Sequence, residues 1–273
     1  MATRSPLINV MTRAADKAAR GLKRDFGEVE QLQVSLKGPA DFVSNADIKA
    51  ERTLRTELAK ARPGFGFLME EGGTVEGSDP RHRWIIDPLD GTSNFLHELP
   101  HFAISIALEQ DGDIIAGVVF DPIKDEMFWA EKGVGAYLND HRLRVSGRRR
   151  LSEALLATGM PFAGHGDRAR YLTQVDAAMA ATAGVRRWGA AALDLAYVAA
   201  GRFDGFWEEG FSAWDIAVGL LLVREAGGYV TELDGGASML ASGSVLAAND
   251  RLHGEIATLL GGGSGGGRRG VRA

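Results

Sequence analysis

Hydrophobic residues recur along the chain at two spacings, and each spacing predicts one kind of element. Residues 5–30 place apolar side chains three and four positions apart, which is typical of a helix with one buried face. The same spacing predicts a second helix over residues 46–61. Ser44 or Asn45 is the expected N-cap of this second helix, and a Pro-Gly pair follows its end.

Short apolar runs bounded by turn residues predict a sheet in the first half of the chain. Residues 84–86 form a candidate buried strand that ends at Asp87. Strands over 103–109 and 114–120 are joined by an Asp-Gly dipeptide that is typical of a tight hairpin. Further short strands are expected at residues 66–68, 127–130, 135–138 and 142–145.

The pattern changes after three consecutive arginines, because predicted helices and strands alternate from there on. A helix over 193–200 ends at Gly201, and residues 214–226 are apolar on most sides, which predicts a buried helix. A strand follows at 229–232. We therefore expect an N-terminal α+β sub-domain over residues 1–150, a C-terminal α/β sub-domain over 151–260, and a flexible Gly/Arg-rich tail over 261–273.

The composition narrows the class of protein. The chain has 273 residues, of which 45% are hydrophobic and 25% are charged, as in soluble globular proteins. The formal net charge is −5, so neutralising nucleic-acid phosphates is not the main task of the protein. Cysteine is absent, which excludes a cysteine nucleophile, a thiolate metal site and a disulfide framework. No apolar run is long enough for a membrane helix and no signal peptide is evident, so we expect a cytoplasmic protein without a membrane partner.

Four acidic segments are candidates for chemistry. Each is expected at the end of a strand or the start of a helix, and each taken alone has an ordinary explanation as a turn, a solvated pair or a helix cap. Together they form the pattern of a metal site built from several carboxylates. The segments are Asp41–Asp47, Met69–Gly73, Trp84–Phe95 and Trp214–Gly228.

The third of these segments carries the most specific signal. Asp87 and Asp90 stand three residues apart at a predicted strand end, so their carboxylates can converge on one point. Gly91 and Thr92 follow at the start of a helical turn, where free backbone N–H groups bind anions. Carboxylates beside an anion site suggest a hard cation together with a phosphate group.

At these residues the sequence resembles the inositol monophosphatase family, within the magnesium-dependent, lithium-sensitive sugar phosphatases. The family motif W-x-[IV]-D-P-[IL]-D-G-T-x-N-F is matched at every fixed position by residues 84–95. The motif D-x-V-[TS]-x-x-D is matched by residues 41–47, and W-D-x-A followed by A-G-G is matched within residues 214–228. The resemblance extends over residues 5–260, and Met69 departs from it because the family usually has glycine at that position.

The resemblance implies a fold and a set of metal ligands. The fold would be α/β in the broad sense (α+β), a layered α-β-α-β-α sandwich that is often assembled as a homodimer. Two to three Mg²⁺ ions would be bound. The first would be held by Glu70, Asp87 and the carbonyl oxygen of Leu89, the second by Asp87, Asp90 and Asp215, and a weaker third by Glu70 and water.

The resemblance also implies roles in the hydrolysis of a phosphate monoester, with myo-inositol 1-phosphate as the leading substrate. Thr92 and Asp47 would position the attacking water, and Glu70 would hold it from the metal side. Backbone N–H groups of Gly91 and Thr92 would bind the phosphoryl oxygens. The substrate-binding residues implied in this way are Leu89, Asp90, Gly91, Thr92, Arg186, Ala191, Glu208 and Asp215.

Other interpretations stay open at this point. The same chemistry could act on fructose 1,6-bisphosphate, histidinol phosphate or a 3′-phosphoadenosine nucleotide. A haloacid-dehalogenase phosphatase would use an Asp nucleophile in a D-x-D motif, whereas the spacing here is D-x-x-D. A regulatory protein that binds RNA or protein is the alternative outside catalysis, and residues 148–150 with the arginines of the tail are its candidate contacts. A solvated turn and a loose chain end explain those arginines more simply, so nucleic acid is not an expected partner.

Overall fold

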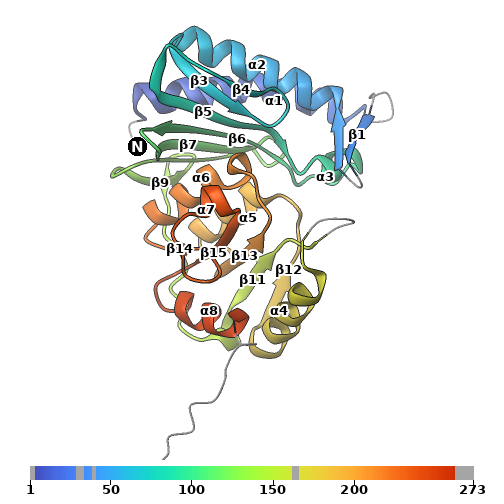
Figure 1. Cartoon of the computed structure of the whole chain (residues 1–273), viewed down its shortest axis with the longest axis vertical. Coiled ribbons are helices and arrows are strands. Elements are labelled where there is room, and N and C mark those ends of the chain that lie inside the picture. Colours follow the sequence, from blue (N-terminus) through green and yellow to red (C-terminus); the bar gives the residue numbers. More distant parts are fainter. Residues whose placement is uncertain (1–3, 29–33, 39–40, 162–165, 262–273) are drawn as a thin grey trace, which may run out of the picture.

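The computed structural model describes residues 4–28, 34–38, 41–161 and 166–261. They form five stacked layers in the order α-β-α-β-α, which run from top to bottom in Figure 1. Three clusters of buried hydrophobic side chains fill the spaces between the layers. This arrangement confirms the layered sandwich that the sequence predicts.

Helices α1 (Pro6–Phe26) and α2 (Asn45–Ala61) form the first layer and cover the outer face of the larger sheet. α2 begins as predicted, because Ser44 caps it and Asp47 completes a capping box. The predicted helix over 5–30 is shorter in the structure. It ends at Phe26, since the N–H of Gly27 bonds back to carbonyl groups of the last turn, and residues 29–33 lie outside the described part.

The larger sheet has the strand order β10-β9-β8-β7-β6-β5-β3-β4, and every neighbouring pair is antiparallel except β3 and β5. The predicted hairpin between β6 and β7 is confirmed, with its turn at Asp111 and Gly112, both of positive φ. The strands of the larger sheet are β3 (Phe65–Met69), β4 (Gly73–Val75), β5 (Asp79–Asp90), β6 (Ala103–Gln110), β7 (Asp113–Asp121), β8 (Glu126–Glu131), β9 (Gly135–Leu138) and β10 (His141–Arg142). A separate pair is formed by β1 (Val34–Gly38) and β2 (Asp41–Ser44).

Two predicted strands differ from the structure. β5 does not end at Asp87, because after an irregular stretch it pairs with β6 again at Asp90. The strand expected over 142–145 is mostly absent, since β10 ends at Arg142 and the chain then leaves the sheet. The N–H of Val145 bonds instead to Ala226 O at 3.2 Å, beyond the end of a helix in the middle layer.

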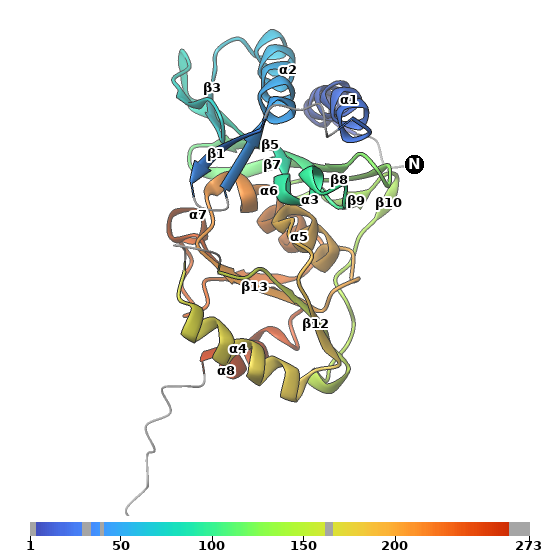
Figure 2. The same cartoon turned by 90° about the vertical axis from the view of Figure 1, so that its right-hand side faces the viewer.

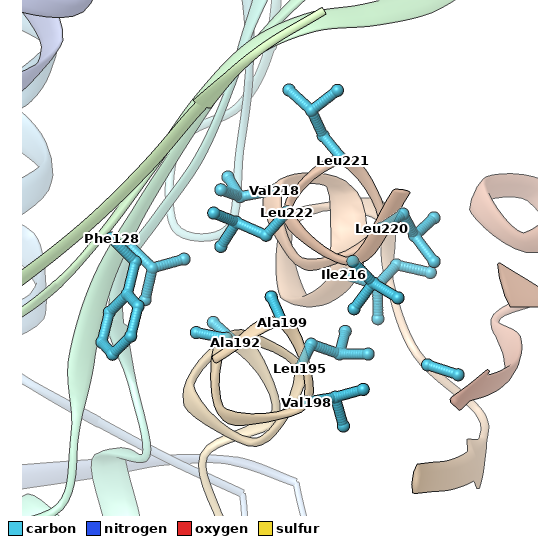
Figure 3. Packing of buried hydrophobic residues seen from close by; sticks show 14 of the residues in the cluster. Phe128, Ala192, Leu195, Val198, Ala199, Ile216, Val218, Leu220, Leu221 and Leu222 are labelled. Atoms are coloured by element: carbon cyan, nitrogen blue, oxygen red, sulfur yellow. The ribbon is translucent and has the colours of Figure 1, made fainter. Parts of the chain in front are cut away.

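The middle layer consists mainly of α5 (Ala191–Ala199) and α6 (Ala213–Glu225), which lie between the two sheets (Figure 2). Both confirm predicted helices, and their apolar side chains interlock as Figure 3 shows. The helices approach closely at Gly219, where an added Cβ would lie 2.4 Å from Leu195 Cδ1. At Gly117 of β7 an added Cβ would lie 2.6 Å from Val218 Cγ1. Glycine at these two positions therefore sets the distance of α6 from α5 and from the larger sheet.

A second sheet, in the order β12-β11-β13-β15-β14, and the helices α4 (Arg168–Ala181) and α8 (His253–Gly261) complete the stack. The strands are β11 (Leu155–Thr158), β12 (Gly184–Arg186), β13 (Gly205–Glu209), β14 (Tyr229–Thr231) and β15 (Ser244–Ala248). The short helices are α3 (Thr92–Leu96), the 3-10 helix η2 (Leu151–Glu153) and α7 (Met239–Ser242).

The chain passes from the first sheet to the second between β10 and η2, the segment that holds the boundary expected near residue 150. Of the residues expected to form a tail, 261–273, Gly261 belongs to α8 and the others lie outside the described part. Within the described ranges, no helix has the length and apolar character needed to cross a membrane.

Candidate functional site

β5 becomes irregular where the first two candidate carboxylates stand. It pairs with β6 up to Asp87 and again at Asp90, with a shift of register between them. Asp87 Oδ1 accepts a hydrogen bond from Leu89 N at 2.9 Å, which fixes the carboxylate against the irregular stretch. Asp87 is buried and Asp90 is half-buried. The irregularity thus leaves both side chains at one end of the sheet.

Four carboxylates lie around this end of β5, and their negative charges raise the pKa values of their neighbours. Burial raises the pKa of Asp87 well above its ordinary value, and Glu70, Asp90 and Asp215 raise it further. Burial also raises the pKa of Asp90, with contributions from Asp215 and Glu70. Glu70 directly follows β3, and Asp215 lies in the first turn of α6. Three of the four acidic segments therefore meet here.

The donor set suits a hard divalent cation. Its atoms are carboxylate and carbonyl oxygens, the ligands that Mg²⁺ prefers. A cation among these groups would remove the repulsion that raises their pKa values. Across the described segments, no three carboxylate or imidazole side chains already stand close enough to hold an ion.

Thr92 contacts Asp47, which comes from the remaining acidic segment, Asp41–Asp47. Thr92 Oγ1 lies 3.0 Å from Asp47 Oδ1 and 3.0 Å from Leu89 O. The other Asp47 oxygen accepts hydrogen bonds from Ser44 N at 2.9 Å and from Ser44 Oγ at 2.6 Å. Asp47 is fully buried. The capping box at the start of α2 thus orients the carboxylate that in turn orients the Thr92 hydroxyl.

Gly91 allows the chain to turn from β5 into α3. Its φ is +93°, a conformation that L side chains rarely adopt. A Cβ added there would lie 3.1 Å from His101 O and 3.3 Å from Ala190 Cβ. The backbone of Gly91 therefore lies against the residue that precedes α5.

The start of α5 supplies backbone donors to the site. Its N-cap residue, Ala190, has no side chain that can cap the helix. Ala192 N donates to Asp90 Oδ2 at 2.8 Å, and the N–H groups of Ala192 and Ala191 both lower the pKa of Asp90 against the effect of burial. Ala191, assigned to the substrate by resemblance, thus lies beside a predicted metal ligand.

Asn94 is a site residue whose importance the sequence analysis missed. It is buried in α3, and its Nδ2 donates to His101 O and Trp188 O, each at 2.8 Å. These bonds tie α3 to the loop that leads into α5. Its place in the motif over residues 84–95 was the available signal, but the partners of the side chain come from loops that the sequence does not place.

Glu208 lies on β13, close to the same cluster. Burial raises its pKa to about 8; Arg187 lowers it and Asp215 raises it. Gly159 packs tightly against it, since a Cβ at that position would lie 1.9 Å from Glu208 Oε1. The structure therefore brings Glu208 beside Asp215, as the resemblance implies.

The structure does not bring Arg186 to this cluster. Arg186 is exposed, and its Nη1 donates to the carbonyl oxygen of Val185 at 3.1 Å. The next residue, Arg187, lies nearer, because it lowers the pKa of both Glu208 and Asp194. Asp194 was also missed by the sequence analysis. It is buried in α5, and burial, Asp90 and Glu208 raise its pKa.

Comparison with known proteins places this geometry in a class. Residues 3–262 match the inositol monophosphatase family. An inositol-1-monophosphatase of Mesorhizobium japonicum is 62% identical over 250 residues, covering 92% of this chain and 94% of the relative. A Nus factor SuhB of Pseudomonas aeruginosa is 45% identical over 259 residues, covering 93% of this chain and 96% of the relative.

A solved structure agrees with these sequence matches. The extragenic suppressor protein suhB of Bartonella henselae superimposes with a TM-score of 0.93 at 55% identity, covering 95% of this chain and all of that one. The fold and the site thus define an enzyme of the phosphatase class, one that hydrolyses phosphate monoesters. The chain belongs to the inositol monophosphatase family.

Proposed function

We propose that this enzyme hydrolyses myo-inositol 1-phosphate to myo-inositol and phosphate in a Mg²⁺-dependent reaction. The observation that carries the proposal is the contact between Thr92 and Asp47 beside the clustered carboxylates. Three relatives named inositol-1-monophosphatase, at 57–62% identity, support the choice of substrate.

The metal ions would be held by the residues that the family resemblance implies. Glu70, Asp87 and the Leu89 carbonyl would hold one ion, and Asp87, Asp90 and Asp215 a second. When bound, Mg²⁺ supplies positive charge to the phosphoryl oxygens and acidity to a water. The oxygen-only donors and the mutual repulsion of these carboxylates support this assignment.

The protein itself positions the attacking water through Thr92. Because the Thr92 hydroxyl donates its proton toward Asp47 or Leu89 O, its lone pairs are left to accept a hydrogen bond from water. Asp47 cannot turn away, since Ser44 holds its other oxygen. Glu70 would accept a second hydrogen bond from that water. The two hydrogen bonds would orient the water so that a lone pair of its oxygen points at phosphorus.

The alcohol part of the substrate would lie between α5 and β13. Glu208 would accept hydrogen bonds from ring hydroxyls, and the backbone at Ala191 would approach the ring closely because its side chain is small. A pKa near 8 means that Glu208 is largely protonated at neutral pH, so it can also donate a hydrogen bond. Arg186 stays a prediction as a substrate residue, although its side chain is turned toward Val185.

A phosphate-release assay tests the proposal. Myo-inositol 1-phosphate would be compared with fructose 1,6-bisphosphate, histidinol phosphate and a 3′-phosphoadenosine nucleotide, with Mg²⁺ and with excess chelator. We expect the highest kcat/KM for the inositol ester, full loss of activity in chelator, and inhibition by lithium. Undiminished turnover after exhaustive chelation would overturn the metal assignment, and a preference for another ester would overturn the substrate.

The resemblance also leads us to propose a homodimer. Light scattering of the purified protein would then give twice the chain mass of 29.2 kDa. A mass equal to that of one chain at working concentration would contradict this.

A further inference from the structure

The segment that joins the two sheets lines an open cavity away from the carboxylate cluster. The segment runs down the side of the molecule from β10 to the lower sheet in Figure 2. The cavity has a volume of about 630 Å³, within the range of small-molecule sites. Its lining residues are Ser146, Gly147, Arg148, Arg149, Arg150, Glu153 and Gly201.

The wall of this cavity is fixed by buried partners. Asn249 is buried, and its Nδ2 donates to Ser146 O at 2.8 Å and to Arg148 O at 3.0 Å. The guanidinium of Arg148 bonds to Asp204 Oδ1 at 3.2 Å, and Asp204 is itself buried. Gly201, with φ +67°, lies so close that a Cβ there would be 3.1 Å from Ser146 N. The segment is therefore held in one shape although it has no regular secondary structure.

The cavity carries an excess of positive charge. Its lining has three guanidinium groups and one carboxylate, and guanidinium groups still outnumber carboxylates when the buried Asp204 is counted. Arg150 pairs with Glu153, but both side chains are largely exposed, so this pair contributes little. Within the described part of the chain, Arg149 forms no ion pair. Three adjacent like charges repel one another, and a bound polyanion would relieve that repulsion.

The lining residues also exclude a ligand that is recognised by stacking of a ring. No aromatic or large aliphatic side chain lines the cavity, so it offers no surface for stacking a ring. Guanidinium groups recognise phosphate oxygens in a bidentate manner, and a 630 Å³ space exceeds the needs of one phosphate. Without such a surface the lining favours a ligand without bases, and we propose that Arg149 and Arg150 bind a free polyphosphate, a ligand with several linked phosphate groups.

This second site is separate from the carboxylate cluster. Ala192 near the start of α5 donates to Asp90, whereas Gly201 lies just beyond the end of the same helix. A nine-residue helix is about 13 Å long, so the two sites stand at opposite ends of α5. A ligand in the cavity would not occupy the place of the substrate, and the proposal does not depend on which ester is hydrolysed.

Titration calorimetry of the full chain with inorganic tripolyphosphate tests the proposal. No divalent cation is added, so that the repelling carboxylates do not take up the probe. The variant is Arg149→Gln/Arg150→Gln, which leaves Arg148 with its buried partner Asp204. The matched control, Arg13→Gln/Arg20→Gln, removes the same charge from exposed positions of α1. We expect the first variant to weaken binding about tenfold and the control less than about twofold.

A second arm repeats the titration with a short oligouridylate. We expect the two substitutions to weaken the binding of tripolyphosphate. If they weaken the binding of the oligouridylate alone, the proposal is overturned in favour of a nucleic-acid backbone. Affinity should fall steeply between about 50 and 200 mM salt. The proposal is overturned if neither probe binds saturably, or if both double variants weaken binding equally. Unchanged melting temperatures and kcat in the first variant would exclude misfolding as the cause.

Discussion

The two helices of the middle layer both begin at the candidate site, but they complete their first turns in opposite ways. At α6, Asp215 Oδ2 accepts a hydrogen bond from Ser212 N at 2.7 Å, so residues three apart in the chain form the cap. At α5 no side chain caps the helix, and Ala192 N is satisfied by Asp90, which comes from β5. One helix closes its own end, while the other leaves its donors to a carboxylate of the site.

This difference concerns how each site carboxylate is held and charged. The cap of α6 holds Asp215 within its own first turn, where Asp215 raises the pKa of Asp87, Asp90 and Glu208. The open start of α5 directs N–H groups at Asp90 and lowers its pKa, which offsets part of the repulsion from Asp215 and Glu70. α5 therefore helps to keep a crowded carboxylate charged and ready to bind a cation.

Replacing Asp90 or Asp215 by asparagine should give the largest effect, a loss of kcat. Asp90→Asn and Asp215→Asn should each lower kcat about 10³-fold, because each removes a charge from the proposed metal site. In chelator neither variant should lose thermal stability, because each Asn relieves repulsion and keeps an oxygen that accepts the same hydrogen bond, from Ala192 N at position 90 and from Ser212 N at position 215. A lower melting temperature of one variant would show that the charge, and not only an acceptor, stabilises that helix start.

Thr92→Ala should lower kcat by about 10²–10³, since it removes the hydroxyl proposed to hold the attacking water. KM and Mg²⁺ affinity should change little, because alanine keeps the backbone N–H and the proposed ligands are untouched. A variant that loses stability but keeps kcat would make Thr92 a structural residue only. Steady-state kinetics and a melting curve on one preparation distinguish these results.

Ser212→Ala tests the self-capped helix alone. Alanine removes the side-chain half of the capping box but keeps the backbone N–H that donates to Asp215, so the loss should be at most about 1 kcal/mol of unfolding free energy in a denaturant titration. Ser238→Ala is the matched control, because Ser238 stands at the N-cap of α7, is exposed and belongs to no capping box. Equal losses in both variants would show that the capping bond of Ser212 is not the cause.

The smallest expected effect is a loss of stability as the pH is lowered, and it should appear at α5 at a higher pH than at α6. Burial lowers the pKa of His101 to about 4, with a further contribution from Lys124. The ring of His101 contacts Trp188 before α5 and Tyr197 within it. Because the folded form binds this proton less readily, stability should fall as pH drops from about 6.5 to about 4.

Hydrogen exchange across this pH range measures the effect. Amides at the start of α5 should lose protection before those at the start of α6, and His101→Gln should remove the difference. Simultaneous loss of protection at both helix starts in the native protein would contradict the assignment to His101.

The sequence predicts features that depend on neighbouring residues. Local spacing predicts α6, the hairpin at Asp111 and Gly112, and an N-cap of α2 at Ser44 or Asn45. The structure confirms these elements and has Ser44 as the cap. The motif over residues 84–95 also identifies the carboxylates that converge. Features that depend on distant partners could not be read in this way.

The features that depend on distant partners include the roles of Asn94, Asp194 and Arg187. One partner of Asn94, Trp188, lies 94 residues further along the chain, and Asp194 is near the site because the start of α5 contacts the end of β5. Arg186 and Arg187 are adjacent in sequence, so spacing alone cannot tell which of them turns toward Glu208. β5 continues past Asp87 because β6 offers a partner at Ala103, which periodicity does not reveal.

The strand order of the smaller sheet has a consequence for how the chain is made. β15, the last strand along the described part of the chain, lies between β13 and β14. Until residues 244–248 emerge, β14 has no strand to pair with and one edge of β13 stays open. An unpaired strand edge is a template for association with other chains. A nascent or truncated chain that stops before β15 would thus expose two edges, so synthesis must pass residue 248 before the smaller sheet is protected from aggregation.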